Sequence, residues 1–133
     1  MAKLLKDVVD AINNPLALKT VGTVNEKGIP NLVIVGTMSV LDEETIVLGD
    51  LKLEKTKNNL FNNGRVAMNV VGPDLSSYQI KGKFKGYEDT SPLACQFNDA
   101  IYDKIKLQCN GIVIIGVEEI YNASLKDAGK KIA

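Results

Sequence analysis

The sequence contains no histidine and only two cysteines, and these absences exclude several kinds of site. Without histidine, neither a Ser-His-Asp nor a Cys-His triad can form, and the commonest transition-metal ligand is missing. Cys95 and Cys109 are too far apart for a CxxC redox pair or a zinc knuckle. We therefore expect no metal site and two free thiols in a reducing cytoplasm.

An excess of charge is also lacking, since 16 Lys and Arg residues balance 16 Asp and Glu residues. There is no tryptophan, and only 5% of the residues are aromatic, so the stacking surface of single-strand binders is missing as well. No apolar run is long enough to cross a membrane, and the charged, amphipathic N-terminus does not resemble a signal peptide. We expect neither a nucleic-acid nor a membrane partner.

What remains is an ordinary globular composition, with 45% hydrophobic residues in 133. A chain of this length predicts a single domain, residues 1–133, with one sizeable core.

The chain is organised around residues 46–71. An apolar β-branched strand ends at Gly49, a polar turn follows, and Lys55 and Thr56 open a helix that Gly64 ends. A second strand then covers residues 65–71. A lysine and a hydroxyl at a helix N-terminus suit a phosphate, although the local sequence by itself favours ordinary surface positions for both.

Hairpins surround this stretch. We predict helices at residues 3–13 and from Pro92, capped by Ser91. Turns at residues 25–28 and 42–44 separate strands at 16–24, 29–40 and 45–49. Strands at 78–88 and 111–117 complete the sheet, residues 118–122 continue the last strand as an edge, and residues 126–133 form a frayed tail.

No strand–helix alternation repeats, which argues against a doubly wound parallel sheet, and no GxGxxG or Walker motif occurs. Antiparallel strands joined by short turns, with helices at the ends, predict a mainly β protein shaped as a small barrel.

Three segments carry a family resemblance: LALKTVGTVNEKGIPNLVIV, IVLGDLKLEKTKNNLFNNGRVAMNV and the closing GIVIIGVEEIY. In this order they resemble the FMN-binding split-barrel family, which includes pyridoxamine 5′-phosphate oxidase and the small bacterial FMN-binding proteins. LEKTKNNL is the most specific piece. The resemblance implies a six- or seven-stranded antiparallel split barrel with about three short helices.

The resemblance also implies where FMN binds. The strand around Val33 lies along the flavin and ribityl chain in the family, the end of the next strand lies beside the isoalloxazine, and a Lys-Thr pair holds the phosphate. Carried over to this sequence, the cofactor-binding candidates are Val33, Ile34, Val35, Thr37, Leu48, Gly49, Asp50, Leu51, Lys55 and Thr56.

Two departures from the family pattern narrow the expected activity. Glu54 stands where the oxidase has an arginine before its phosphate lysine, and the oxidase's arginine-bearing C-terminal segment is missing. Pyridoxamine phosphate oxidation is therefore not expected. Ile34 stands where the small FMN proteins often have a polar residue, so its contact with a cofactor would be apolar or through the backbone.

The sequence thus predicts an FMN-binding oxidoreductase or electron-transfer flavoprotein, with no side chain marked as an acid or base. Asp50 could tune the flavin potential or simply form the turn. Two alternatives stay open: the same fold with a deazaflavin, and a non-enzymatic barrel that binds a small ligand. The family resemblance further implies a homodimer with FMN at the interface, and the apolar strand at residues 65–71 suggests the paired face.

Overall fold

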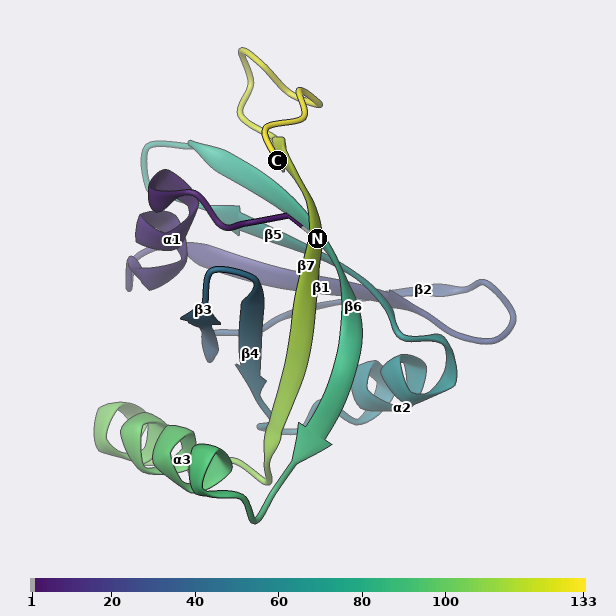
Figure 1. Ribbon diagram of the computed structural model, residues 1–133, viewed down its shortest axis with the longest axis vertical. Helices are drawn as coiled ribbons and strands as arrows, with labels where there is room; N and C mark the ends of the chain where they lie inside the picture. Colours follow the sequence, from purple (N-terminus) through teal and green to yellow (C-terminus); the bar gives the residue numbers. More distant parts are fainter. Residues whose placement is uncertain (1) are drawn as a thin grey trace.

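Seven antiparallel strands form one sheet, and three helices pack on its outside (Figure 1). The computed structural model describes residues 2–133. The strand order is β2-β1-β5-β6-β7-β4-β3, so the sheet curls on itself with β2 and β3 as its two edges. The elements are α1 (Lys6–Asn13), β1 (Leu18–Val24), β2 (Pro30–Ile34), β3 (Met38–Asp42), β4 (Thr45–Gly49), α2 (Glu54–Asn63), β5 (Arg65–Val71), β6 (Ser77–Glu88), α3 (Pro92–Ile105) and β7 (Ile112–Asn122).

The barrel core consists of the side chains that point to the inner face of the sheet. Along β5, for example, Val66, Met68 and Val70 are buried and alternate with more exposed residues. Residues from β1, β4, β6 and β7, together with Val8 and Ile12 of α1, complete one continuous cluster. The predicted mainly β split barrel is confirmed, with seven strands and three helices.

One predicted strand is wrong in its extent. The expected strand at residues 29–40 is two strands, β2 and β3, separated by residues 35–37. β2 pairs with β1, where Ile34 lies opposite Thr20, whereas β3 pairs with β4, where Met38 lies opposite Leu48. The two edges of the sheet therefore follow each other in sequence and diverge at Gly36. This divergence is the split of the barrel.

The segment from β4 to β5 forms as the sequence predicts. α2 begins at Glu54, one residue before the predicted start, and Gly64 ends it in the left-handed conformation with φ of 73°. Two amides fix the helix to β1: Asn59 Nδ2 donates to Thr23 Oγ1 at 3.0 Å, and Asn63 Nδ2 donates to the Val24 carbonyl at 2.7 Å.

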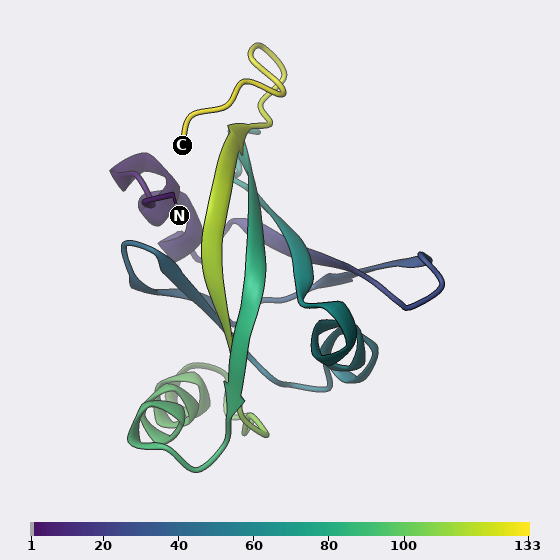
Figure 2. The same cartoon turned by 45° about the vertical axis from the view of Figure 1, so that its right-hand side comes forward.

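The helices divide between the two sides of the barrel. α1 and α3 lie at opposite ends of one side, and α2 lies on the other side (Figures 1 and 2). α3 begins at the predicted cap, because Ser91 Oγ accepts from the Ala94 N–H at 3.1 Å. None of the helices within residues 2–133 has the length and apolarity needed to cross a membrane.

The predicted frayed tail is also wrong. The C-terminal residues return to β7, where the Ile132 N–H donates to the Ile120 carbonyl at 2.9 Å and the Ile120 N–H donates to the Ala133 carbonyl at 3.0 Å. Both of these C-terminal residues pack against the core. These two residues cover the edge that the sequence predicts for residues 118–122. The burial of Ile132 and Ala133 offsets the loss of conformational entropy when this short segment becomes ordered.

Candidate functional site

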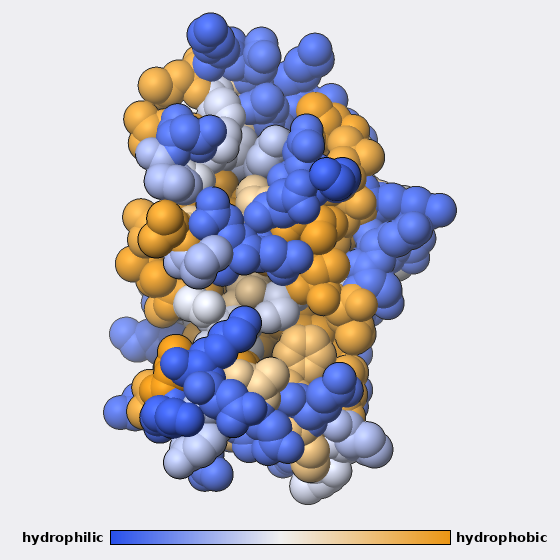
Figure 3. Space-filling model, turned by 90° about the vertical axis from the view of Figure 1, so that its left-hand side faces the viewer, coloured by the Kyte–Doolittle hydropathy of each residue, from blue (hydrophilic) through white to orange (hydrophobic). Residues whose placement is uncertain are grey.

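A groove of about 550 Å³ opens at the split of the barrel. We call it the split groove. Its walls come from the end of α1, the start of β1, the β2–β3 connection, the β4–α2 loop and the last turns of α3. The surface that carries α1 and α3 shows apolar patches separated by hydrophilic side chains (Figure 3). The lining residues used below are Ile12, Lys19, Val33, Ile34, Val35, Thr37, Gly49, Leu51, Lys52, Ile101, Lys104 and Ile105.

The split groove brings together two predicted segments that are distant in sequence. From the β2–β3 region come Val33, Ile34, Val35 and Thr37, and from the end of β4 come Gly49 and Leu51. They meet because β3 returns along β4 immediately after the split. An apolar groove with a few polar groups is the usual form of a small-molecule site.

Thr37 ties the two segments together. Its hydroxyl donates to the Gly49 carbonyl at 2.8 Å. The hydroxyl proton is therefore already used, and toward a ligand the Thr37 oxygen can act only as an acceptor.

Gly49 leaves no room for a side chain. A Cβ at this position would lie 2.7 Å from Ile101 Cδ1 and 2.8 Å from Cys109 Sγ. The glycine thus allows α3 to approach β4 closely, which sets the width of the groove on that side.

Leu48 and Asp50 do not line the groove. The Leu48 side chain lies wholly in the core. Asp50 is buried too, and its Oδ1 accepts from the Leu53 N–H at 2.9 Å and the Lys52 N–H at 3.2 Å. Its Oδ2 accepts from the Tyr87 hydroxyl at 2.7 Å and from Lys57 Nζ at 3.3 Å. The prediction that these two residues contact a cofactor stays a prediction.

The charge of Asp50 is therefore held by the fold. Burial by itself raises the pKa of the Asp50 carboxyl, but the hydrogen bonds from the Leu53 N–H, Tyr87 and Lys57 outweigh burial and lower it. Burial and the same carboxylate raise the pKa of Tyr87. These contacts give the turn-forming role of Asp50 a complete physical basis.

Lys55 and Thr56 lie in the first turn of α2, directly after the loop that Asp50 holds. Lys55 is exposed, and no side chain caps the N-terminus of the helix. Thr56 is buried, and its Oγ1 accepts from Asn31 Nδ2 of β2 at 3.4 Å. Neither residue lines the split groove, but Leu53, which precedes the helix, does. The first turn offers free N–H groups, a hydroxyl and a cation, which is the donor set of a phosphate site.

Comparison with known proteins decides the family. An uncharacterized protein of Methanocaldococcus jannaschii is 31% identical over 138 residues, covering all of this chain and 90% of that protein. The chain belongs to one family with that protein, and the fold described above is the split barrel of the pyridoxamine 5′-phosphate oxidase-like proteins. No family model matches the sequence.

Solved structures share the split-barrel fold. HupZ of Group A Streptococcus has a TM-score of 0.81 and 23% identity, covering 95% of this chain and 98% of HupZ. An FMN-binding protein from Syntrophomonas wolfei has a TM-score of 0.80 and 15% identity, covering 88% and 84%. A putative pyridoxamine 5′-phosphate oxidase from Lactobacillus delbrueckii, an F420 reductase and a heme storage protein from Vibrio cholerae match with TM-scores of 0.73, 0.69 and 0.60.

Sequence reasoning missed two basic residues of this split-barrel protein's groove, Lys19 and Lys104. The signal for Lys19 was its place in β1: it shares the inner face with Val21 and Thr23, so a cation points toward the barrel interior. No local pattern marks Lys104, because its position depends on where α3 packs.

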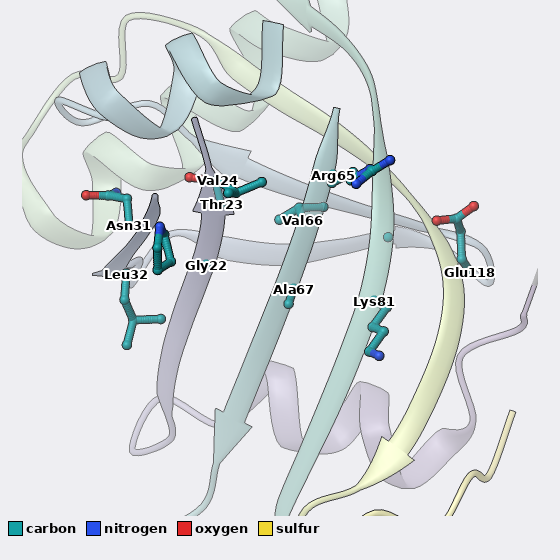
Figure 4. A pocket seen from close by; sticks show the side chains of 12 residues that line it. Gly22, Thr23, Val24, Asn31, Leu32, Arg65, Val66, Ala67, Lys81 and Glu118 are labelled. Atoms are coloured by element: carbon teal, nitrogen blue, oxygen red, sulfur yellow. The ribbon is translucent and has the colours of Figure 1, made fainter. Parts of the chain in front are cut away.

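A second hollow lies on the outer surface of the sheet (Figure 4). We call the surface around it the outer face, defined by Gly22, Val24, Leu32, Arg65, Ala67 and Lys81. It is open and its surface is mostly apolar, although Arg65, Lys81 and Glu118 are among its lining residues. Such a surface suits a protein partner better than a cofactor.

Proposed function

We propose that this split-barrel protein binds FMN and acts as an oxidoreductase or an electron-transfer protein. The observation that carries the proposal is the split groove itself. It joins the end of β2 to the end of β4 and leads, through Leu53, to the uncapped first turn of α2.

The residues present fit FMN. The backbone at Val33 to Val35 and the Thr37 oxygen would receive the flavin and ribityl portions, with Leu51 as an apolar wall. Lys55 and the first-turn N–H groups of α2 would hold the phosphate. When bound, FMN supplies the electron transfer, and the protein supplies its position and surroundings.

The first test is the cofactor content of the purified protein. We expect a visible flavin spectrum, with FMN identified by the mass of the released cofactor. A deazaflavin spectrum would favour the alternative cofactor, as in the matching F420 reductase, and a Soret band would favour heme, although the chain has no histidine to ligate it. A colourless protein that binds neither added FMN nor deazaflavin contradicts the proposal.

The phosphate site has its own test. Lys55→Ala removes a charge-assisted contact, so FMN affinity should fall by about 1.5–3 kcal/mol, roughly ten- to hundredfold. Fluorescence titration of the apoprotein with FMN measures this. Lys126→Ala, in the exposed C-terminal loop, is the matched control and should bind FMN normally. If Lys55→Ala also binds FMN normally, the phosphate lies elsewhere.

We further propose a twofold homodimer. The structure moves the candidate interface to a different surface from the one that the sequence suggested. The apolar residues of β5 that suggested pairing, Val66, Met68 and Val70, lie in the core. Leu32, which is 74% exposed, and Leu18, which is 60% exposed, instead lie on or beside the outer face. A second copy would bury these side chains. Both cysteines are free thiols, in agreement with a cytoplasmic location, which we also propose.

A further inference from the structure

Lys19 is a buried cation that forms no ion pair within the described part of the chain. The residue is 7% exposed and lines the split groove. The three ion pairs within residues 2–133 join Lys3 to Glu43, Lys6 to Asp10 and Lys57 to Asp50, and none includes Lys19.

The ammonium group of Lys19 opens into the groove. Within the described residues, every fully buried side-chain nitrogen or oxygen has a hydrogen-bond partner. Lys19 Nζ has no such partner, so it retains contact with the solvent that fills the groove. An ammonium that is largely removed from water and has no partner loses part of its hydration, and an anion compensates for that loss.

The surroundings add positive charge and no negative charge. Lys104 of α3 and Lys52 of the β4–α2 loop line the same groove, and no aspartate or glutamate within residues 2–133 does. Lys19 and Lys104 line one groove, and burial, followed by the charge of Lys104, lowers the pKa of Lys19. A bound anion would offset the charge of both lysines.

We propose that Lys19 and Lys104 bind the carboxylate or phosphate group of a small organic anion. Ile12, Ile101 and Ile105 form an apolar wall beside the two lysines, so the ligand carries an apolar body. That the anion is the substrate of a flavoprotein rests on the proposed function. The binding site itself does not, because neither Lys19 nor Lys104 is among the residues that we propose for FMN, although both line the same groove.

The test uses phenyl phosphate and benzoate as probes and benzyl alcohol as the neutral control. Calorimetric titrations at low salt are made with the protein as purified and with FMN-saturated protein. We expect both anions to bind, more weakly at higher salt, and benzyl alcohol to bind at least tenfold more weakly. The stronger of the two anions identifies the natural head group.

Two variants locate the site. Lys19→Met keeps an unbranched side chain only one atom shorter and removes the charge, and it should weaken anion binding by about tenfold or more. Lys104→Gln, on the exposed side of α3, should also weaken anion binding. This variant still tests the site if Lys19→Met does not fold. Lys126→Gln should change nothing.

The outcomes separate this inference from the proposed function. Anion binding that needs Lys19 in a protein that takes no FMN supports the anion site and contradicts the flavoprotein. Normal FMN binding with anion affinities equal in the wild type and both groove variants overturns the anion site. A tenfold loss of FMN affinity in Lys19→Met would assign these lysines to the cofactor phosphate and would also overturn the inference.

Discussion

Asp50 is the residue on which the geometry at the start of α2 depends. Asp50→Asn removes the charge and one acceptor, leaving the Tyr87 hydroxyl or Lys57 without its partner. We expect the free energy of unfolding to fall by about 1–3 kcal/mol at pH 7. Urea denaturation measures this free energy. Asp127→Asn, in the exposed C-terminal loop, is the control, and its free energy of unfolding should stay within about 0.5 kcal/mol of wild type.

The same residue predicts a pH dependence. Because folding lowers the pKa of Asp50, its stabilising contribution is complete above the unfolded-state pKa of about 3.9 and disappears as the pH falls through the lower folded-state value. The stability gap between wild type and Asp50→Asn should therefore narrow below about pH 4. A gap that stays constant down to pH 2 would mean that the carboxylate charge is not what stabilises the turn.

The sequence identified some residues that have a structural or binding role, but it did not identify the full physical reason for each role. Gly49 was predicted to end a strand and to bind the cofactor, and the structure shows that its missing side chain also makes room for Ile101 and Cys109. Lys19 was not found, because a lysine within a strand is usually a solvated residue. Only its alternation with Val21 and Thr23 places it inside the barrel.

Elements with strong local signals were predicted to within about a residue. Gly64 ends α2, and Ser91 with Pro92 begins α3, because caps and glycine stops act over a few residues. The break between β2 and β3 was missed, because residues 32–35 are apolar throughout and Gly36 is its only local mark. Which strand each half joins is decided by pairing with β1 and β4, and such pairing leaves no local pattern.

The contact between α3 and β4 yields a prediction at the scale of elements. Gly49→Ala places a methyl group against Ile101 and Cys109, so α3 must shift, and stability should fall by about 1–3 kcal/mol. Adding Ile101→Val removes the nearest carbon and should restore part of the loss. Gly36→Ala, where a Cβ meets nothing within 4 Å, is the control. Thermal unfolding compares them, and equal melting temperatures for Gly49→Ala and Gly36→Ala would show that this contact is loose.

For the whole molecule, the outer face predicts the oligomeric state. Light scattering after size exclusion should give twice the chain mass for wild type. Leu32→Glu places a charge in the proposed interface and should give the mass of one chain. Leu125→Glu, at a leucine that is 88% exposed in the C-terminal loop and does not line the hollow of the outer face, should remain dimeric. A monomeric wild type, or a dimer unaffected by Leu32→Glu, would contradict this interface.

The strand order also has a kinetic consequence. β4 pairs with β7, so that Thr45 lies opposite Gly116, while α2, β5, β6 and α3 occur between them in the sequence. The barrel cannot close until almost the whole chain is available, and closing such long loops carries an entropic cost before the pairing repays it. During synthesis the β3–β4 hairpin keeps the β4 edge unpaired until the ribosome has released β7. Folding should therefore be slow for a chain of this size. A misfolded chain would begin to aggregate at the unpaired edge of β4.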